Sequence, residues 1–181
     1  MNPFQTMTEK LLEKLKMNDR KAQQEFYNRF SVMMFRLVYR YVSNEQDAGS
    51  IVNLSFFRIF SHISGFEYSG ENALYAWIKK IAVNESLMFL RRKVSFCELD
   101  DEPEGDTPDI CTNENALDAE DCYRLIRKLP EDLRSVFNLH AIDGFSHKEI
   151  ALQLGIKESS SRVYLTRARK FLRDYLNQKS I

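Results

Sequence analysis

The chain has 181 residues, of which 44% are hydrophobic and 29% charged, with 13 Phe, 8 Tyr and 1 Trp. This length allows one domain or two small ones, and the aromatic content excludes a fully disordered chain. No run approaches the roughly 20 apolar residues that span a bilayer, so we expect no direct membrane insertion.

The compartment and the cofactor content follow from the N-terminus and the cysteines. The N-terminus lacks the apolar core of a signal peptide. Three cysteines without a CxxC pair (Cys97, Cys111 and Cys122) favour neither a disulfide framework nor a zinc site. We therefore expect a cytoplasmic protein with no metal and no cofactor.

The net charge is zero, but the charges are segregated along the chain. Residues 1–94 hold 14 Lys/Arg and 9 Asp/Glu, residues 95–122 hold 11 Asp/Glu and no Lys/Arg, and residues 123–181 hold 12 Lys/Arg and 6 Asp/Glu. Two basic modules separated by an acidic segment suggest two contacts with a polyanion. Proline, glycine and acidic residues without a helical period predict a flexible linker over residues 95–118, between domains at 1–94 and 119–181.

The apolar residues recur at helical spacing along both modules, and no window alternates as a strand does. Asp19 is a candidate cap for a helix that reaches Tyr41, and Ser43 to Gln46 resembles a capping box for the next. The sequence predicts an all-α fold, with helices at about residues 8–16, 20–41, 45–64, 74–93, 117–128 and 131–142.

The segment from Ser146 onward predicts a helix-turn-helix. Ser146 to Glu149 forms a capping box, and Gly155 follows Ala151 by four residues, as the turn of this motif requires. A second helix over residues 158–176 has one apolar side and one basic side, with Ser159, Ser160 and Arg162 near the end that enters a major groove. Ser161 lies where such helices bury an aliphatic side chain, and its hydroxyl can bond to the carbonyl four residues earlier.

The loop from Phe66 to Asn72 precedes a helix that ends in Arg91-Arg92-Lys93. Aromatic rings interleaved with cations suit single-stranded nucleic acid, because bases stack on the rings and phosphates meet the cations. Tyr68 is the functional candidate in this polar loop, whereas Trp77 is more typical of a helix core. No catalytic constellation accompanies these residues, because the three histidines are scattered and no P-loop or HExxH motif is present. We expect no enzymatic activity and no small-molecule substrate.

The order and spacing of three stretches resemble an RNA polymerase sigma factor of the extracytoplasmic-function (ECF) type. The stretches are Asp47 to Phe56, then Tyr68 to Glu71 with Ala76 to Asn84 and Leu90 to Arg92, then Leu129-Pro130 with Phe145 to Ile156 and Leu165 to Arg169. The resemblance covers about residues 20–178 outside the linker. It implies that the N-terminal module binds core polymerase and opens the −10 promoter element, and that the C-terminal module reads the −35 element.

The resemblance also implies roles for individual residues. For the −10 element the implied residues are Tyr68, Ser69, Gly70, Asn72, Lys80, Asn84, Arg91 and Arg92. For the −35 element they are Lys148, Ser159, Ser160, Arg162, Val163, Thr166, Arg167 and Lys170. For core polymerase they are Asp47, Ser50, Ile51, Asn53 and Leu54. An anti-sigma factor is a further implied partner.

One stretch departs from the family pattern. Gly49, Ser50, Asn53 and Leu54 stand where such proteins usually have acidic residues and a Gln-Glu pair that grip the polymerase, so the sequence allows a nonpolar contact through Leu54. Two other functions stay open from the sequence. One is a stand-alone helix-turn-helix regulator, and the other is a degenerate sigma-like protein that binds a partner and never initiates transcription.

Overall fold

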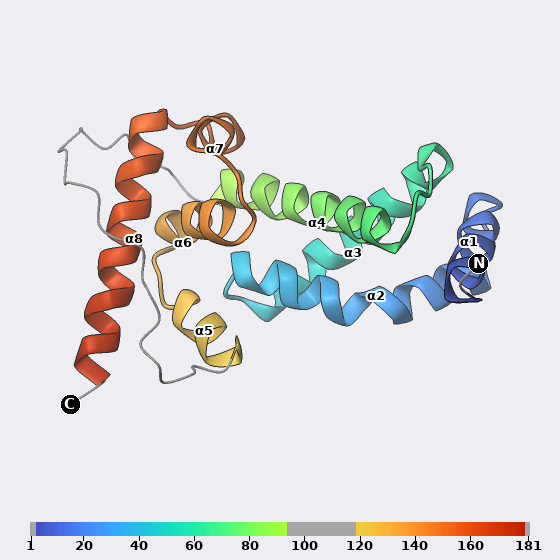
Figure 1. The fold of residues 1–181 in the computed structure, drawn as a ribbon, viewed down its shortest axis with the longest axis horizontal. Helices are drawn as coiled ribbons and strands as arrows, with labels where there is room; N and C mark the ends of the chain where they lie inside the picture. Colours follow the sequence, from blue (N-terminus) through green and yellow to red (C-terminus); the bar gives the residue numbers. More distant parts are fainter. Residues whose placement is uncertain (1–2, 94–118, 180–181) are drawn as a thin grey trace. The chain divides into compact units, whose positions relative to one another are not determined.

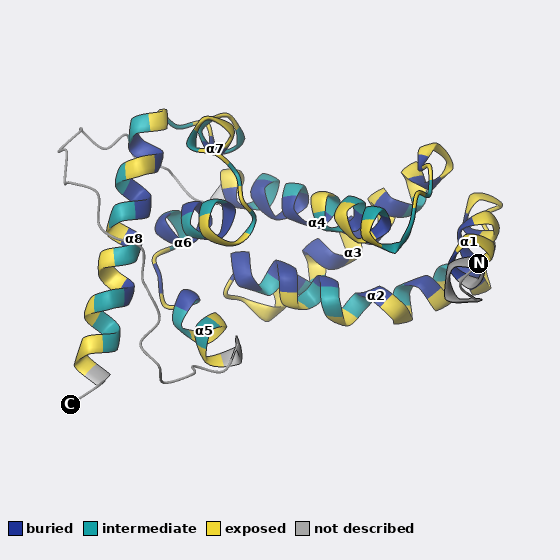
Figure 2. Ribbon diagram, viewed as in Figure 1, coloured by how far each residue is buried: buried dark blue, intermediate teal, exposed yellow. Residues whose placement is uncertain are grey.

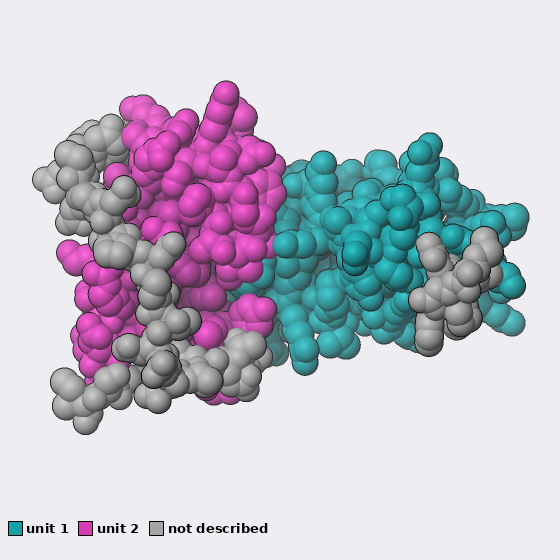
Figure 3. All heavy atoms as spheres, in the orientation of Figure 1, with its two compact units in different colours: residues 1–89 teal, residues 90–181 magenta. Residues whose placement is uncertain are grey.

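The structure, a computed structural model, describes residues 3–93 and 119–179, and every regular element in these ranges is a helix (Figure 1). The predicted all-α class is therefore confirmed for the described residues. The linker predicted at residues 95–118 lies outside them. The chain divides into two compact units, residues 1–89 and 90–181 (Figure 3), and each is described by itself.

Unit 1 is built from three helices and most of a fourth, with a short 3-10 turn between the third and the fourth. The elements are α1 (Pro3–Lys16), α2 (Arg20–Tyr41), α3 (Glu45–His62), η1 (Ile63–Gly65) and α4 (Glu71–Lys93). Helices α2 and α3 pack together through an aromatic cluster, in which Phe26 lies 4.5 Å from Phe30 and 6.4 Å from Phe56 between ring centroids. Such pairs add packing energy to the apolar area that they bury. Figure 2 shows the buried residues of these helices in dark blue.

The starts of α2 and α3 are fixed by side-chain caps. Asp19 caps α2 as predicted, since its Oδ1 accepts the Ala22 N–H at 2.8 Å. The capping box predicted at Ser43 is wrong by one residue. Asn44 is the cap, because its Oδ1 accepts the N–H groups of Gln46 and Asp47 at 2.8 and 3.1 Å. A short amide side chain bonds two free N–H groups of the first turn, which leaves Ser43 outside the helix.

Unit 2 comprises α5 (Ala119–Ile126), α6 (Glu131–Phe137), η2 (Asn138–Ile142), α7 (His147–Leu154) and α8 (Glu158–Lys179). The segment η2 continues α6 with a π-helical turn, so the single helix predicted at residues 131–142 changes its hydrogen-bond pattern halfway. Helix α8 packs against both α6 and α7. Val136, Ile150 and Ala168 are fully buried where these helices meet.

A buried arginine joins α6 to the turn that precedes it. Arg134 is only 2% exposed, and its Nη1 donates to the carbonyls of Arg127 and Leu129 at 3.0 and 3.3 Å. The carboxylate of Glu131 lies 3.6 Å from its Nη2. Burial lowers the pKa of Arg134, and Glu131 opposes this shift by favouring the charged form. The guanidinium therefore satisfies carbonyls of the turn that connects α5 to α6.

Candidate nucleic-acid interface

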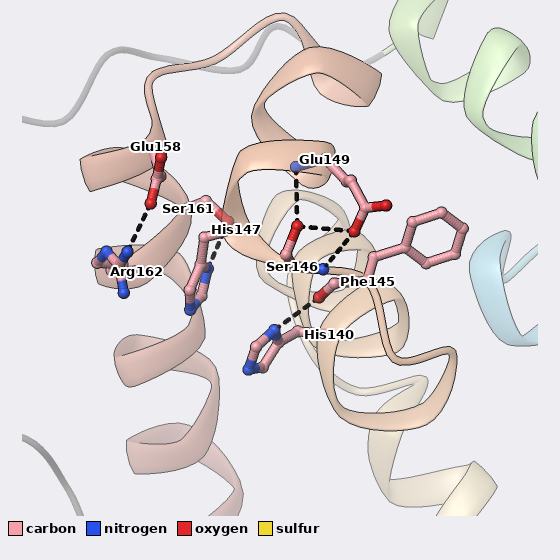
Figure 4. A network of polar contacts seen from close by, with 8 residues as sticks. All are labelled: His140, Phe145, Ser146, His147, Glu149, Glu158, Ser161 and Arg162. Atoms are coloured by element: carbon pink, nitrogen blue, oxygen red, sulfur yellow. Dashed lines mark hydrogen bonds and ion pairs between the residues drawn. The ribbon is translucent and has the colours of Figure 1, made fainter.

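Helix α7 begins with the predicted capping box (Figure 4). The backbone N–H and the hydroxyl of Ser146 donate to Glu149 Oε2 at 2.8 and 2.7 Å, and the Glu149 N–H donates to Ser146 Oγ at 3.3 Å. These hydrogen bonds from Ser146 lower the pKa of the Glu149 carboxyl group, because they favour its ionised form. Ser146 and Glu149 thus cap the first turn of α7 with hydrogen bonds in both directions.

Helix α7 ends at the glycine that the sequence predicts for the turn. Gly155 has φ 71° and ψ 34°, a left-handed conformation, and its N–H donates to the Ala151 carbonyl at 2.9 Å. An added Cβ would meet no atom within 4 Å, so the backbone conformation rather than crowding requires glycine. The predicted helix-turn-helix is therefore formed by α7, this turn and α8.

Helix α8 has a buried side and an opposite polar side. Tyr164, Leu165, Ala168 and Leu172 are buried. Ser159, Val163, Thr166 and Lys170, at spacings of four, three and four residues, follow the opposite side. The predicted −35 cations are all exposed, namely Lys148 on α7 and Arg162, Arg167 and Lys170 on α8.

Ser160 does not belong to this polar side. Its side chain is fully buried in unit 2, and its Oγ has no hydrogen-bond partner among the described residues. Each residue of an α-helix advances the side chain by about 100°, which turns Ser160 away from Ser159 and toward the core. The prediction that Ser160 contacts DNA is therefore wrong for this conformation.

Arg162 already has an intramolecular partner. Its Nη2 lies 2.5 Å from Glu158 Oε1, one turn earlier on α8, and both side chains are largely exposed (Figure 4). An exposed pair of this kind contributes little to stability. Arg162 can therefore exchange Glu158 for another acceptor at low cost.

Two histidines and a serine connect η2, α7 and α8. The rings of His140 and His147 stack with centroids 4.3 Å apart, and His140 Nδ1 donates to the Phe145 carbonyl at 2.9 Å. His147 Nδ1 lies 2.9 Å from Ser161 Oγ (Figure 4). Ser161 thus bonds across to α7 at the place where an aliphatic residue was expected. The hydroxyl partner is therefore His147, whereas the Lys157 carbonyl four residues earlier accepts the backbone N–H of Ser161 at 3.1 Å.

Acidification should lower the folding stability of unit 2, because His147 takes up a proton. Burial lowers the pKa of His147 from 6.5 to about 4, with further lowering by His140, Arg162 and Arg169, while Glu158 opposes the shift. The folded state therefore takes up this proton at a lower pH than the unfolded state. Stability from neutral His147 is complete above about pH 6.5 and is lost as the pH falls toward 4.

We expect the melting temperature of unit 2 to fall between pH 7 and pH 4.5, and the fall to be smaller in His147→Gln. Glutamine keeps a hydrogen-bonding group but does not titrate. Thermal melts of the full chain at half-unit pH steps give the measurement, and His62→Gln on the exposed end of α3 is the control. Parallel curves for wild type and His147→Gln would contradict the prediction.

In unit 1 the predicted −10 residues lie in the loop before α4 and along that helix. Tyr68 is partly exposed, and Ser69 and Asn72 are exposed, while Gly70 has a φ of 125° that favours glycine. Lys80, Asn84 and Arg91 share one side of α4 by their spacing, and Arg92 is exposed beside them. Trp77 packs on buried Phe66 with ring centroids 4.5 Å apart but is itself partly exposed, so it lies at the edge of the core to which it was assigned.

The predicted polymerase-binding residues on α3 separate into exposed and buried groups. Ser50 and Asn53 are exposed, Leu54 is 44% exposed, and Asp47 is partly exposed. Ile51 is only 3% exposed, so its predicted contact with polymerase is wrong, because its side chain packs in the core of unit 1.

Sequence reasoning missed Phe57, which is 66% exposed one turn after Leu54. The hydroxyls of Ser50 and Ser61 on the same stretch donate to the carbonyls four residues before them, at 3.0 and 2.8 Å. A partner protein that covers α3 here would therefore not leave the Ser50 and Ser61 hydroxyls without hydrogen bonds. The spacing from Leu54 was the available signal, but an exposed Phe cannot be distinguished from a core Phe by spacing alone.

Two absences concern only the residues that the structure describes. No group of three or more His, Cys, Asp or Glu side chains there could hold a metal ion. Among the helices in these ranges, none has both the length and the apolar character needed to cross a membrane.

The described residues form two helical units, and the second contains a helix-turn-helix with an exposed basic face. These features define the class, an all-α DNA-binding protein. Comparisons with known proteins agree with this class. Residues 26–95 match the family model for Sigma-70 region 2, and residues 120–172 match that for Sigma-70 region 4.

The ECF RNA polymerase sigma-E factor of Salmonella typhimurium is 31% identical over 173 residues, covering 88% of this chain and 89% of the relative. Its counterpart from Haemophilus influenzae is 29% identical over 175 residues, covering 90% and 91%. A solved complex of the sigma factor RpoE with the anti-sigma factor NepR from Bartonella quintana has 20% identity and a TM-score of 0.49, covering 85% of this chain and 98% of that one.

The chain belongs to the ECF family of RNA polymerase sigma factors. It is therefore a sigma factor that binds core RNA polymerase and directs promoter-specific initiation of transcription. The stand-alone regulator considered from the sequence is not favoured.

Proposed function

We propose that this sigma factor divides its work between its two helical domains. Residues 1–94 would bind core polymerase and open the −10 element, residues 119–181 would read the −35 element, and residues 95–118 would connect them. The observation that carries the proposal is the polar side of α8, which lies opposite the buried Tyr164, Leu165 and Ala168 and starts at the N-terminal end of the helix.

At the −35 element, α8 would enter the major groove with its N-terminal turns. Ser159, Arg162, Val163 and Thr166 occupy these turns, and their side chains are at least partly exposed. Residues near the start of a recognition helix contact base edges, whereas cations further along it meet phosphates. Lys148 and Lys170 would accordingly anchor the backbone of the duplex, together with Arg167.

At the −10 element, Tyr68 would stack on an unpaired base beside the polar loop. Lys80 and Arg91 on one side of α4 would meet the phosphates of the same strand, with Arg92 beside them. Asn84 lies between these cations and is partly exposed. Its amide can make two hydrogen bonds to one base edge. Ser69, Gly70 and Asn72 would line the approach to Tyr68.

Core polymerase would contact α3 through Ser50, Asn53, Leu54 and Phe57, with Asp47 at the margin. Exposed aromatic and aliphatic side chains on one stretch of helix are typical of an interface core. The apolar part of this contact would come from Leu54 and Phe57, which are 44% and 66% exposed. A degenerate sigma-like relative would lack the contact altogether. Pull-down of core polymerase tests that distinction.

The remaining parts of the proposal concern setting and partners. The protein would act in the cytoplasm without catalytic activity of its own. An anti-sigma factor would hold it inactive before the inducing signal. Promoter-DNA binding by the chain with and without core polymerase is the direct test, because a sigma factor largely depends on core enzyme for promoter binding and a stand-alone regulator does not.

Arg162→Ala should narrow the difference in affinity between a cognate and a scrambled −35 element. A lost base contact costs about 1–3 kcal/mol on the cognate sequence and little elsewhere. Lys170→Ala is the matched comparison, because Lys170 lies two turns further along α8. Losing a phosphate contact should weaken both DNAs equally and reduce the slope of affinity against salt by about one unit.

The measurement is holoenzyme binding to both DNAs at several salt concentrations. Should Arg162→Ala weaken both DNAs to the same extent, Arg162 is a phosphate anchor, and base reading would rest on Ser159 or Val163.

A further inference from the structure

The N-terminal helix α1 contacts the part of unit 1 that carries Tyr68. Helix α1 packs on α2 and on η1, the turn that leads into the loop before α4 (Figure 1). Thr8 of α1 is buried, and its hydroxyl donates to Glu71 Oε1 at the start of α4. Residues 63 positions apart in the sequence are therefore in direct contact.

Arg29 of α2 completes the network. Its Nη1 donates to Thr8 Oγ1 at 3.1 Å and its Nη2 to Glu71 Oε1 at 3.2 Å. Three helices thus meet at the first residue of α4, which lies three residues after Tyr68. The ion pair between Arg29 and Glu71 is partly exposed, so it contributes little to global stability but restricts the start of α4.

Tyr68 is enclosed at one end by the same region. Its hydroxyl is buried without a hydrogen-bond partner among the described residues, while the residue as a whole is partly exposed. Burial raises the pKa of Tyr68, and the carboxylates of Glu71 and Glu9 raise it further, while Arg29 opposes them. Charged groups on α1, α2 and α4 therefore act electrostatically on the Tyr68 hydroxyl.

We infer that Thr8 and Arg29 are positioning residues for promoter opening, because they hold Glu71 and thereby the loop that presents the ring of Tyr68 to an unpaired base. The inference rests on the role proposed above for Tyr68. A ring that is already fixed loses less conformational freedom when a base stacks on it than a ring on an unrestrained loop. Helix α1 then belongs to the melting site without touching DNA.

The test uses holoenzyme with the full chain and measures the lifetime of the open complex on one promoter. Thr8→Val and Arg29→Gln should each shorten this lifetime on the order of 2- to 10-fold, the effect of freeing one side chain. Affinity for core polymerase and for a −35 duplex should not change. Thr8→Ser should restore the lifetime, since it retains the hydroxyl. Arg36→Gln, an exposed position on the same helix as Arg29, should match wild type.

Tyr68→Ala separates the failure of this inference from the failure of the proposed function. In the Tyr68→Ala background, Thr8→Val should have no further effect on the open complex, whereas a purely structural role would add its own loss. If Tyr68→Ala shortens the lifetime but Thr8→Val and Arg29→Gln do not, the inference is overturned and the proposed function stands. If Tyr68→Ala has no effect, both are overturned. Thr8 is buried, so Thr8→Val can fold poorly, whereas Arg29 is exposed and Arg29→Gln should fold normally. Arg29→Gln alone then provides the test.

Discussion

Arg134→Ala should lower the free energy of unfolding of unit 2 by about 3 kcal/mol, because each buried polar group left without its partner costs about 1–3 kcal/mol. The change removes the donor for the carbonyls of Arg127 and Leu129 and leaves Glu131 without its buried partner. Buried carbonyls that lose their donor retain the cost of their desolvation. Chemical denaturation of the full chain, followed by a probe in unit 2, gives the measurement.

The control for this effect is Arg124→Ala. Arg124 pairs with Asp121 at 3.3 Å three residues away, and both side chains are mostly exposed. Such a pair contributes at most about 1 kcal/mol, so the two arginines should differ clearly. Equal losses of unfolding free energy in Arg124→Ala and Arg134→Ala would show that the buried hydrogen bonds of Arg134 add no stability beyond that of an exposed ion pair.

Tyr68→Ala should cost about 1–3 kcal/mol of open-complex stability, since each base stacked on an aromatic ring contributes about that much. Closed-complex binding should barely change, because duplex DNA offers no unpaired base. Permanganate reactivity of thymines in the −10 region reports the change. Reactivity equal to wild type would refute the role assigned to Tyr68.

Two further substitutions can be measured in the same experiment. Tyr68→Phe should retain most of the open complex, since the ring stacks and the hydroxyl is buried without a hydrogen-bond partner among the described residues. Asn84→Ala should relax base preference at one −10 position and leave the others unchanged.

The sequence predicted local features well because the residues that determine them are neighbours in the chain. The capping box of Ser146 and Glu149 and the left-handed Gly155 are each fixed within four residues, so local pattern alone was enough to identify the helix-turn-helix. The cap at Asn44 was misassigned because Ser43 and Asn44 are both good caps. Only the geometry of the first turn distinguishes them.

Errors at the candidate sites came from the rotational phase of the helices. Ile51 and Ser160 are close in sequence to exposed contacts but face the core, and Phe57 faces solvent beside buried Phe56. Periodicity fixes such a phase only when the apolar stripe is unambiguous. The contact between Thr8 and Glu71 could not be predicted at all, because nothing local relates residues so distant in the chain.

The pairing of Glu158 with Arg162 has a consequence for how this protein searches a chromosome. If α8 enters the major groove as proposed, the Glu158 carboxylate at its leading end would repel the phosphates of every duplex that α8 approaches. Only a sequence that gives Arg162 a better acceptor than Glu158 would compensate for this repulsion. Because a genome offers about a million or more competing sites, weakening all of them equally leaves more of the protein free for its promoters.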